Sequence, residues 1–310
     1  MSRQIVYRAY GGPDVLAWEE GDPGSPGNGQ VLIRSEMIGV NPVDWKLVAG
    51  LFSRVDPAPF PGTPGWAATG IVEALGAEVL DFTVGQAVVV DSRARLAVTF
   101  GSRAGTFAER FVVDTRQIVP RPAQLSIEQA AGLPSSAVAG YSMIQNLAIT
   151  SKDTLLVHGA SGSVGSAAAQ IALERGASVI GTASTSNHDY LRSLGVIPVV
   201  YGDHLVDALR DLDPITASAD AVGGAESVAA TRAVLIPGGH AVTAWGDRHS
   251  QRAGIPWVQH PHDELHQTVA LASKGALTVR IAETFALSQA TDALRLSQTR
   301  HPAGKILLAP

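Results

Sequence analysis

The chain has 310 residues, of which 45% are hydrophobic and 16% charged, so it can bury a sizeable core in about two domains. Its net charge is −5 and it has no dense basic run, so nucleic acid is not expected as the main partner. The absence of cysteine excludes disulfides and thiolate metal sites.

Residues 1–120 contain short β-like runs separated by turns rich in Gly and Pro, which is typical of an all-β, barrel-like domain. The clearest runs are Val31–Ile38, Gly70–Leu75, Ala87–Val90 and Glu109–Val113. The first residues lack the apolar stretch of a signal peptide, so we expect a cytoplasmic protein.

The pattern changes from about residue 121, where strands begin to alternate with helices. Ser126 and Gln129 resemble a capping box that opens the first helix. The predicted strands are Thr154–His158, Ser178–Thr182, Pro198–Tyr201, Ala217–Val222 and Gly239–Ala244, and the predicted helices lie near 163–175, 187–194, 204–211 and 225–235. This alternation predicts a doubly wound parallel sheet with right-handed crossovers, an α/β fold.

Two long uncharged stretches, 129–151 and 154–173, are broken by Pro134 or by glycines and carry many polar side chains. Neither fits a bilayer-spanning helix of roughly 20 mainly apolar residues, so no membrane association is expected.

A glycine-rich turn follows the strand that ends at His158. Gly159, Gly162 and Gly165 are spaced as in dinucleotide-binding turns, between a predicted strand and a predicted helix. Glycines let the chain turn sharply, let the backbone approach a pyrophosphate and let helix and strand pack closely. The helix N-terminus then offers unpaired N–H groups to the phosphates. Ser161, Gly162, Ser163 and Val164 are expected to cradle the pyrophosphate, with Gly159 and Gly165 shaping the turn.

The end of the second strand of this domain indicates which dinucleotide is bound. An NAD site usually carries an acid there for the ribose 2′-OH, but residues 182–188 contain none, and Asp189 falls inside the next helix. Ser184 and Asn187 could donate hydrogen bonds to a 2′-phosphate, and Arg192 could add charge. We therefore predict NADPH as cofactor, although Ser184 and Asn187 could merely cap the helix and Arg192 could be an ordinary solvated side chain.

The last section, 262–310, contains two helix patterns and a terminal strand pattern, which could continue the parallel sheet or return to the first domain. The only metal-like spacing is His260–His266, where His262 and His266 would share a helix face. No third dedicated ligand accompanies them, so we expect the start of a surface helix and no metal site.

Several motif-like segments follow one another along nearly the whole chain: Ile38–Lys46, Gly70–Gly76, Gly105–Glu109, Ala130–Pro134, the glycine turn, Ala221–Gly224, Pro237–Gly239 and Gly304–Ile306. In this order they resemble the zinc-free quinone oxidoreductases of the medium-chain dehydrogenase/reductase superfamily. The resemblance implies a GroES-like β-barrel catalytic domain in residues 1–120, a Rossmann NADP-binding domain in 121–255, and a segment 256–310 that returns to the catalytic domain. The cofactor would lie in a cleft, with its nicotinamide near Asn41–Lys46.

Zinc-dependent members of the superfamily carry a cysteine where Asn41 stands and a Gly-His-Glu where Gly65–Ala67 stands. Here those ligands are Asn41, Trp66 and Ala67, which cannot hold zinc to polarise an alcohol. The resemblance therefore implies hydride transfer to an acceptor that is already electrophilic. Zinc-free relatives often keep an acid where Ala67 stands, so the wall of the pocket is expected to differ.

For the chemistry we predict that Asn41 donates a hydrogen bond near the nicotinamide or the acceptor and that Lys46 stabilises the developing oxyanion. Trp45 and Trp66 would form aromatic walls of the substrate pocket, and Asp44 suits the N-cap of a short helix. Trp45 could instead be core, and Lys46 could be solvated. Further cofactor contacts are expected from residues at strand ends or family positions: Ser184, Asn187, Tyr201, Val222, Gly223, Ala244, Trp245 and Lys305.

The sequence thus predicts an NADPH-dependent quinone reductase. Two alternatives stay open: a reductase of α,β-unsaturated carbonyls, and a non-catalytic NADPH-binding protein of the crystallin or sensor kind. The resemblance also implies a homodimer, formed through the fifth-strand edge near Gly239–Trp245.

Overall fold

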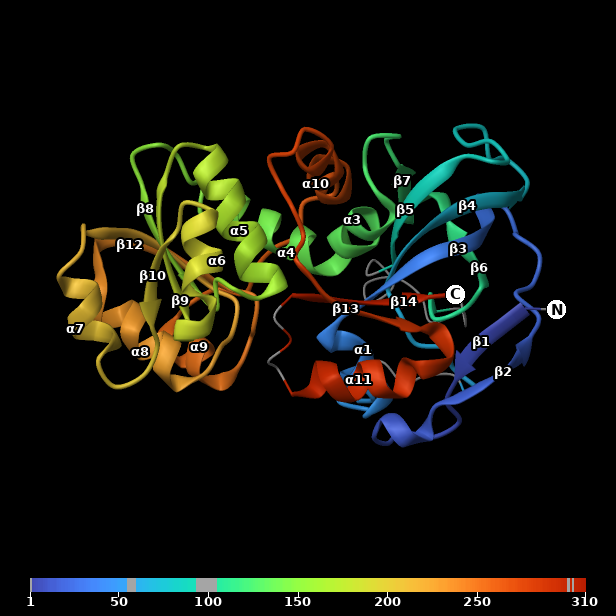
Figure 1. Ribbon diagram of the computed structural model, residues 1–310, viewed down its shortest axis with the longest axis horizontal. Coiled ribbons are helices and arrows are strands. Elements are labelled where there is room, and N and C mark those ends of the chain that lie inside the picture. Colours follow the sequence, from blue (N-terminus) through green and yellow to red (C-terminus); the bar gives the residue numbers. More distant parts are fainter. Residues whose placement is uncertain (1, 55–59, 93–104, 300–301, 303) are drawn as a thin grey trace. The chain divides into compact units, whose positions relative to one another are not determined.

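The computed structural model describes residues 2–54, 60–92, 105–299, 302 and 304–310 (Figure 1). The chain forms two compact units. The first comprises Met1–Ser135 and Arg280–Pro310, and the second comprises Ser136–Val279. The second unit is therefore an insertion within the first.

The first unit is built on a mainly antiparallel sheet that the C-terminal segment joins, with one parallel pairing between its last two strands. Its strands are β1 (Ser2–Val6), β2 (Ala17–Gly21), β3 (Gln30–Val40), β4 (Ala67–Leu75), β5 (Ala87–Asp91), β6 (Arg110–Asp114), β7 (Ile118–Pro120), β13 (Ile281–Ala286) and β14 (Lys305–Ala309). Its α-helices are α1 (Pro42–Val48), α3 (Ile127–Gly132) and α11 (Ala290–Gln298), with short 3-10 turns at Pro13–Val15, Thr115–Gln117 and Leu287–Gln289. The main sheet has the order β13-β14-β3-β4-β5-β7, with β6 also paired to β3. The four β runs predicted in this region are confirmed as β3 to β6.

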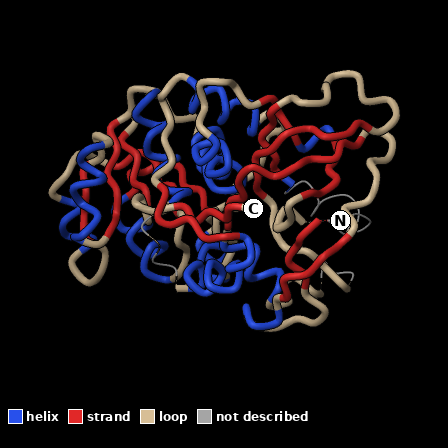
Figure 2. Tube along the Cα trace, turned by 45° about the vertical axis from the view of Figure 1, so that its right-hand side comes forward, coloured by secondary structure: helices blue, strands red, loops and turns tan. Residues whose placement is uncertain are grey.

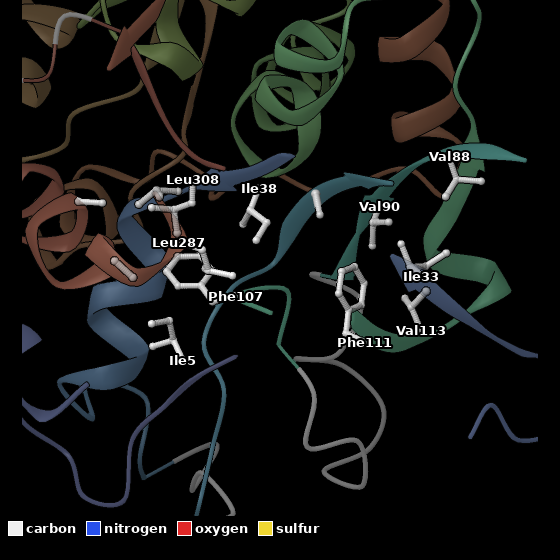
Figure 3. Close-up of a cluster of buried hydrophobic side chains, with 14 of the residues drawn as sticks. Ile5, Ile33, Ile38, Val88, Val90, Phe107, Phe111, Val113, Leu287 and Leu308 are labelled. Carbon is white, nitrogen blue, oxygen red and sulfur yellow. The ribbon is translucent and has the colours of Figure 1, made fainter. Parts of the chain in front are cut away.

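The C-terminal strand β14 pairs antiparallel with β3, which returns the end of the chain to the barrel. The core of this unit draws on both parts of the sequence: Ile38 and Phe107 lie beside Leu287 and Leu308 (Figure 3). Because the C-terminal residues are completely buried there, the barrel needs this segment to close its core.

The second unit alternates strands and helices along the chain. Figure 2 shows the strands of the protein in red and its helices in blue. The strands of this unit are β8 (Thr154–His158), β9 (Ser178–Ala183), β10 (Ile197–Val200), β11 (Ile215–Asp220) and β12 (Leu235–Thr243), and its helices are α4 (Val138–Asn146), α5 (Ser163–Glu174), α6 (His188–Ser193), α7 (Leu205–Arg210), α8 (Ala225–Val234), α9 (Arg248–Ala253) and α10 (Glu264–Ser273). The sheet order is β10-β9-β8-β11-β12 and every pairing is parallel. This is the predicted doubly wound sheet, with its switch point between β8 and β11.

The two units divide later along the chain than the predicted boundaries at 120 and 255. Helix α3 stays with the first unit because it packs on β3, β4 and β14, and its predicted cap is present, since the Ser126 hydroxyl accepts the Gln129 N–H. Helix α10 stays with the second unit because it packs on α4. The first crossing falls at Ser135, whose φ of 66° is rare for a residue with a Cβ, and whose N–H is held by Asp91 Oδ2 at 3.0 Å.

Within the described part of the chain, every helix is too short or too polar to cross a bilayer.

Candidate functional site

The predicted glycine turn forms the connection between β8 and α5. Gly159 adopts a φ of 72° directly after the strand, and its N–H donates to Thr182 Oγ1 on the neighbouring strand at 3.0 Å. Gly162 is the N-cap of α5, and its N–H donates to Gly159 O at 3.0 Å. The half-buried residues Ser161–Val164 therefore surround the N-terminus of the helix, where the first N–H groups have no partner within the helix.

An added Cβ would have a different consequence at each of the three glycines of this turn. A Cβ on Gly165 would lie 2.3 Å from the carbonyl oxygen of Gly159, and a Cβ on Gly159 would lie 2.4 Å from Val222 Cγ1. A Cβ on Gly162 would meet its nearest atom, Gly159 O, only at 3.4 Å. Gly165 is thus required by packing against the backbone and Gly159 by its positive φ, whereas a Cβ on Gly162 would make only an ordinary van der Waals contact.

The other predicted cofactor residues of this unit gather at the same edge of the sheet. Because the strands are parallel, their carboxyl ends lie along one edge, which is where open α/β sheets bind ligands. Ser184 follows β9, Tyr201 follows β10, Val222 and Gly223 follow β11, and Ala244 and Trp245 follow β12. Tyr201 and Val222 are exposed, and a Cβ on Gly223 would lie 2.3 Å from the Trp245 ring.

Two acids that the sequence reasoning missed shape this edge. Asp220, buried at the end of β11, accepts the N–H groups of Val222 and Gly223 at 3.0 and 2.8 Å. Asp247 accepts the Gly224 N–H at 2.7 Å and caps α9, and these N–H donors lower the pKa of its carboxyl. The sequence offered one signal for Asp220: it is an acid at the end of a predicted strand, directly before Ala221–Gly224. Both acids serve the backbone of the loops.

The segment after β9 carries hydroxyl and amide groups. Asn187 Nδ2 donates to Ser184 Oγ at 3.0 Å, and Ser184 Oγ lies 3.0 Å from Ser186 Oγ. Arg192 pairs with Asp189 at 2.8 Å, and both side chains extend into solvent. Asp189, the first acid after β9, is therefore exposed and paired with the guanidinium of Arg192.

In the first unit, the predicted catalytic residue Asn41 lies where β3 ends and α1 begins. Asn41 is the N-cap of α1, and Pro42 occupies the first helical position. The expectation that Asp44 is the N-cap residue is wrong: Asp44 is the third residue of the helix, and its Oδ2 accepts the Asn41 N–H at 2.7 Å as in a capping box. The reason is that Pro42 needs no hydrogen bond at its nitrogen, so the helix starts earlier than the acid alone suggested.

Lys305 contacts Asn41 across the sheet. The register of β14 with β3 pairs Ile306 with Val40, so Lys305 comes opposite Asn41. Its Nζ lies 2.5 Å from Asn41 Oδ1, and both side chains are buried, with exposed fractions of 2% and 1%. The structure thus brings Lys305 together with the predicted catalytic residue; a contact of Lys305 with cofactor stays a prediction.

The remaining predicted residues of the first unit lie on or near α1. Lys46 is buried to an exposed fraction of 9%, and its Nζ lies 5.6 Å from the ring centroid of Trp45. Trp45 packs partly against the barrel core, and its buried Nε1 has no hydrogen-bond partner among the described residues. Trp66 is buried just before β4, where its carbonyl accepts the Ser92 N–H at 2.8 Å.

Asp44 is the most perturbed carboxyl of this cluster. Burial raises its pKa to about 7, against the opposing effects of the Asn41 N–H and the Lys305 charge. Its exposed fraction is 0%, and its Oδ1 has no hydrogen-bond partner among the described residues. The carboxyl thus titrates near neutral pH inside the barrel.

The raised pKa predicts how Asp44 affects stability. The folded state holds the proton up to about pH 7, whereas the unfolded state releases it near 3.8, so stability falls as pH rises between these values. We expect the free energy of unfolding, relative to an Asp44→Asn variant, to decrease by about 1.4 kcal/mol per pH unit in this window. Urea unfolding of both proteins from pH 5 to pH 8 measures this difference. A difference that is independent of pH would contradict the titration of Asp44 in this window.

Two family models match the chain. The first, described as an alcohol dehydrogenase GroES-like domain, matches residues 27–123, and the second, described as a zinc-binding dehydrogenase, matches residues 198–308. A quinone oxidoreductase of Pseudomonas aeruginosa is 29% identical over the full length of both chains. An NADPH-dependent alkenal/one oxidoreductase of Arabidopsis thaliana chloroplasts is 31% identical, covering 98% of this chain and 78% of that protein. The structure of the quinone oxidoreductase of Coxiella burnetii superposes with a TM-score of 0.86 at 26% identity, covering 100% of this chain and 99% of that one.

The chain belongs to the quinone oxidoreductase family of the medium-chain dehydrogenase/reductase superfamily. The predicted fold, a GroES-like barrel with a Rossmann-type domain, is thereby confirmed. Members of this family are oxidoreductases that bind a nicotinamide cofactor. The glycine turn fits such a group, because the first N–H groups of α5 have no partner within the helix and can donate to a phosphate.

The description of the second family model names zinc, and the resemblance assigns the zinc ligands to three positions of this chain. Asn41, Trp66 and Ala67 offer no thiolate, imidazole or carboxylate ligand, and the chain has no cysteine. Among the described residues, no three His, Asp or Glu side chains lie close enough to hold a metal ion. His260 instead lies 2.9 Å from Glu264, the first residue of α10, as expected of a helix start.

Proposed function

We propose that this protein is an NADPH-dependent quinone reductase that works without zinc. The observation that carries the proposal is the carboxyl edge of the parallel sheet: a glycine cradle at α5, and no acid at the end of β9. Quinone plus one hydride and one proton gives hydroquinone, while NADPH becomes NADP+. The bound cofactor supplies the hydride, and the chain's residues bind, orient and stabilise charge.

The preference for NADPH over NADH rests on the segment after β9. A carboxylate at this position would repel a 2′-phosphate, whereas Ser184 and Asn187 can donate to it. Asp189 does not oppose this assignment, because its carboxylate is exposed and paired with Arg192. Tyr201, exposed beyond β10, is proposed to contact the adenosine phosphate, and the first N–H groups of α5 the pyrophosphate.

In the first unit, we assign the acceptor to the residues of α1. Asn41 donates a hydrogen bond to the acceptor or the nicotinamide ribose, and Lys46 steadies the negative charge that develops on the acceptor oxygen. Trp45 and Trp66 supply aromatic surface for a flat acceptor. A buried ammonium such as Lys46 is more effective at stabilising charge than an exposed one, because less water screens it.

A second candidate is the reduction of α,β-unsaturated carbonyls at the C=C bond. It is favoured by the Arabidopsis relative, whose name gives an alkenal/one as its substrate and whose identity to this chain is 31%. Asn41 and Lys46 would then stabilise an enolate oxygen, so the same side chains serve both reactions.

We also propose that the protein is a cytoplasmic homodimer. Strand β12 is the edge of the second unit's sheet, and Ile236 and Trp257 expose apolar surface beside it. Analytical ultracentrifugation, with a Trp257→Glu variant as comparison, tests the dimer.

The function is tested by parallel oxidation of NADPH and NADH with 9,10-phenanthrenequinone and with a simple enal. We expect kcat/KM to be at least tenfold higher with NADPH, an effect of about 1.4 kcal/mol or more from the 2′-phosphate contacts. We also expect the quinone to exceed the enal. Faster turnover of the enal would select the second candidate, and tight NADPH binding without oxidation by either acceptor would favour a non-catalytic protein. Prior treatment with a chelator is expected to leave the rate unchanged.

A further inference from the structure

The side-chain amide of Asn41 has, among its contacts, two partners of opposite kind that both favour one orientation. Lys305 Nζ can only donate, and it lies 2.5 Å from Asn41 Oδ1. The carbonyl of Gly39 can only accept, and it takes a hydrogen bond from Asn41 Nδ2 at 3.2 Å. A flipped amide would place its nitrogen against the ammonium and its oxygen against the carbonyl, so both contacts select the same orientation.

The fold directs Lys305 to this position by close packing around two glycines. A Cβ on Gly39 would lie 3.1 Å from Lys305 Cε and 2.3 Å from the carbonyl of Ala131, so the lysine stem needs the space over Gly39. Gly304 has a φ of 141°, and a Cβ there would lie 2.4 Å from the carbonyl of Arg280. The backbone N–H of Lys305 then donates to the same Arg280 carbonyl at 2.7 Å.

Asp44 contacts the same cluster at the backbone of Asn41. Its Oδ2 accepts the Asn41 N–H at 2.7 Å, and when the carboxyl is ionised, above its pKa of about 7, it also attracts the Lys305 ammonium. Asn41 is therefore fixed at its backbone by Asp44 and at its side chain by Lys305.

We propose that Lys305 is a positioning residue for Asn41: it occupies the amide oxygen, so that Asn41 can act toward the acceptor or cofactor only as a hydrogen-bond donor. This inference rests on the proposed function, since it specifies how Asn41 takes part in hydride transfer. It assigns to Lys305 a role within the barrel that differs from contact with the cofactor. It also suits acceptors whose oxygen gains negative charge, because a donor stabilises that charge.

The orientation is tested in the cofactor-free protein by NMR. The chain has four asparagines, so selective 15N labelling gives four side-chain amide pairs, and Asn41→Ala identifies the pair of interest. In the wild type we expect the Asn41 amide protons to exchange slowly with water. Lys305→Met should accelerate this exchange at least tenfold, whereas Lys152→Met, a change at an exposed lysine, should not. Unchanged protection in Lys305→Met would overturn the proposal, whether or not the protein reduces quinones.

Steady-state kinetics test whether Lys305 affects turnover through Asn41. We expect Lys305→Met to lower kcat by about 10- to 100-fold, the scale of a misplaced catalytic group, with little change in the Kd for NADPH. In an Asn41→Ala background the same substitution should change kcat less than twofold, because its effect passes through Asn41. Equal effects in both backgrounds would overturn the proposal.

If Lys305→Met does not fold, two further variants replace it. The paired variant Asp44→Asn with Lys305→Met removes both charges, and Lys305→Gln keeps a donor and should retain part of the activity. An inactive wild type would refute the proposed function and leave the NMR test in force.

Discussion

Replacing Gly165 by alanine is expected to abolish useful dinucleotide binding and to destabilise the second unit. The added Cβ would lie 2.3 Å from the carbonyl oxygen of Gly159, a backbone atom that cannot move aside without distorting the turn. Overpacking of this kind costs about 1–3 kcal/mol of stability. If the distortion removes two phosphate contacts, affinity for NADPH falls by about 100-fold, or ~2.7 kcal/mol. Fluorescence titration with NADPH and urea unfolding measure the two effects.

Gly162→Ala is the matched control for this substitution. Its Cβ would meet nothing closer than 3.4 Å, and the φ of −77° suits any residue, so we expect stability to change by less than about 0.5 kcal/mol. We expect its affinity for NADPH to fall by about tenfold, because the methyl group would occupy the space assigned to the pyrophosphate. Wild-type affinity in both variants would show that the cofactor does not use this turn.

Asn41→Asp is expected to remove most of the turnover while keeping the fold. The substituted carboxylate can still accept from Lys305 Nζ, but it has no N–H to donate to the acceptor. Loss of one donor to a developing oxyanion typically lowers kcat by about 10²–10³-fold. We expect the Kd for NADPH to stay within about twofold, a difference below 0.5 kcal/mol.

Asn28→Asp, at an exposed position of the same unit, is the control for the change in charge. Steady-state kinetics with 9,10-phenanthrenequinone and thermal unfolding of all three proteins separate a catalytic loss from a loss of structure. If Asn41→Asp kept more than half of the wild-type kcat, Asn41 would have no role as a donor.

Much of the fold could be predicted because its signals are local. Strand β8, the glycine turn and α5 match the predicted ranges closely, since an apolar run, a glycine-rich turn and a helical period follow one another. The predicted start of β12, at Gly239, lies four residues after the observed start at Leu235. Pro237–Gly239 is typical of a turn, but here the strand continues from Leu235 with a register shift opposite Ile215 and Ala217.

The site could be predicted only in part because some of its contacts join residues far apart in the sequence. Asn41 and Lys305 are 264 positions apart, and only the pairing of β14 with β3 brings them together. The local pattern predicts Asp44 as a helix N-cap, whereas its burial and its raised pKa depend on the barrel around it. The cofactor edge was more accessible, because parallel strands bring their carboxyl ends together whatever the loops contain.

The central claim is that this chain delivers hydride from bound NADPH to a quinone without a metal ion. A direct test is the single-turnover oxidation of NADPH by 9,10-phenanthrenequinone on chelator-treated protein, with NADPH carrying either hydrogen or deuterium at the transferring C4 position. We predict that oxidation proceeds after chelation and is slower with deuterium, because breaking this C–H bond limits the step. Oxidation that stops with the chelator, or that never occurs although NADPH binds, would contradict the account.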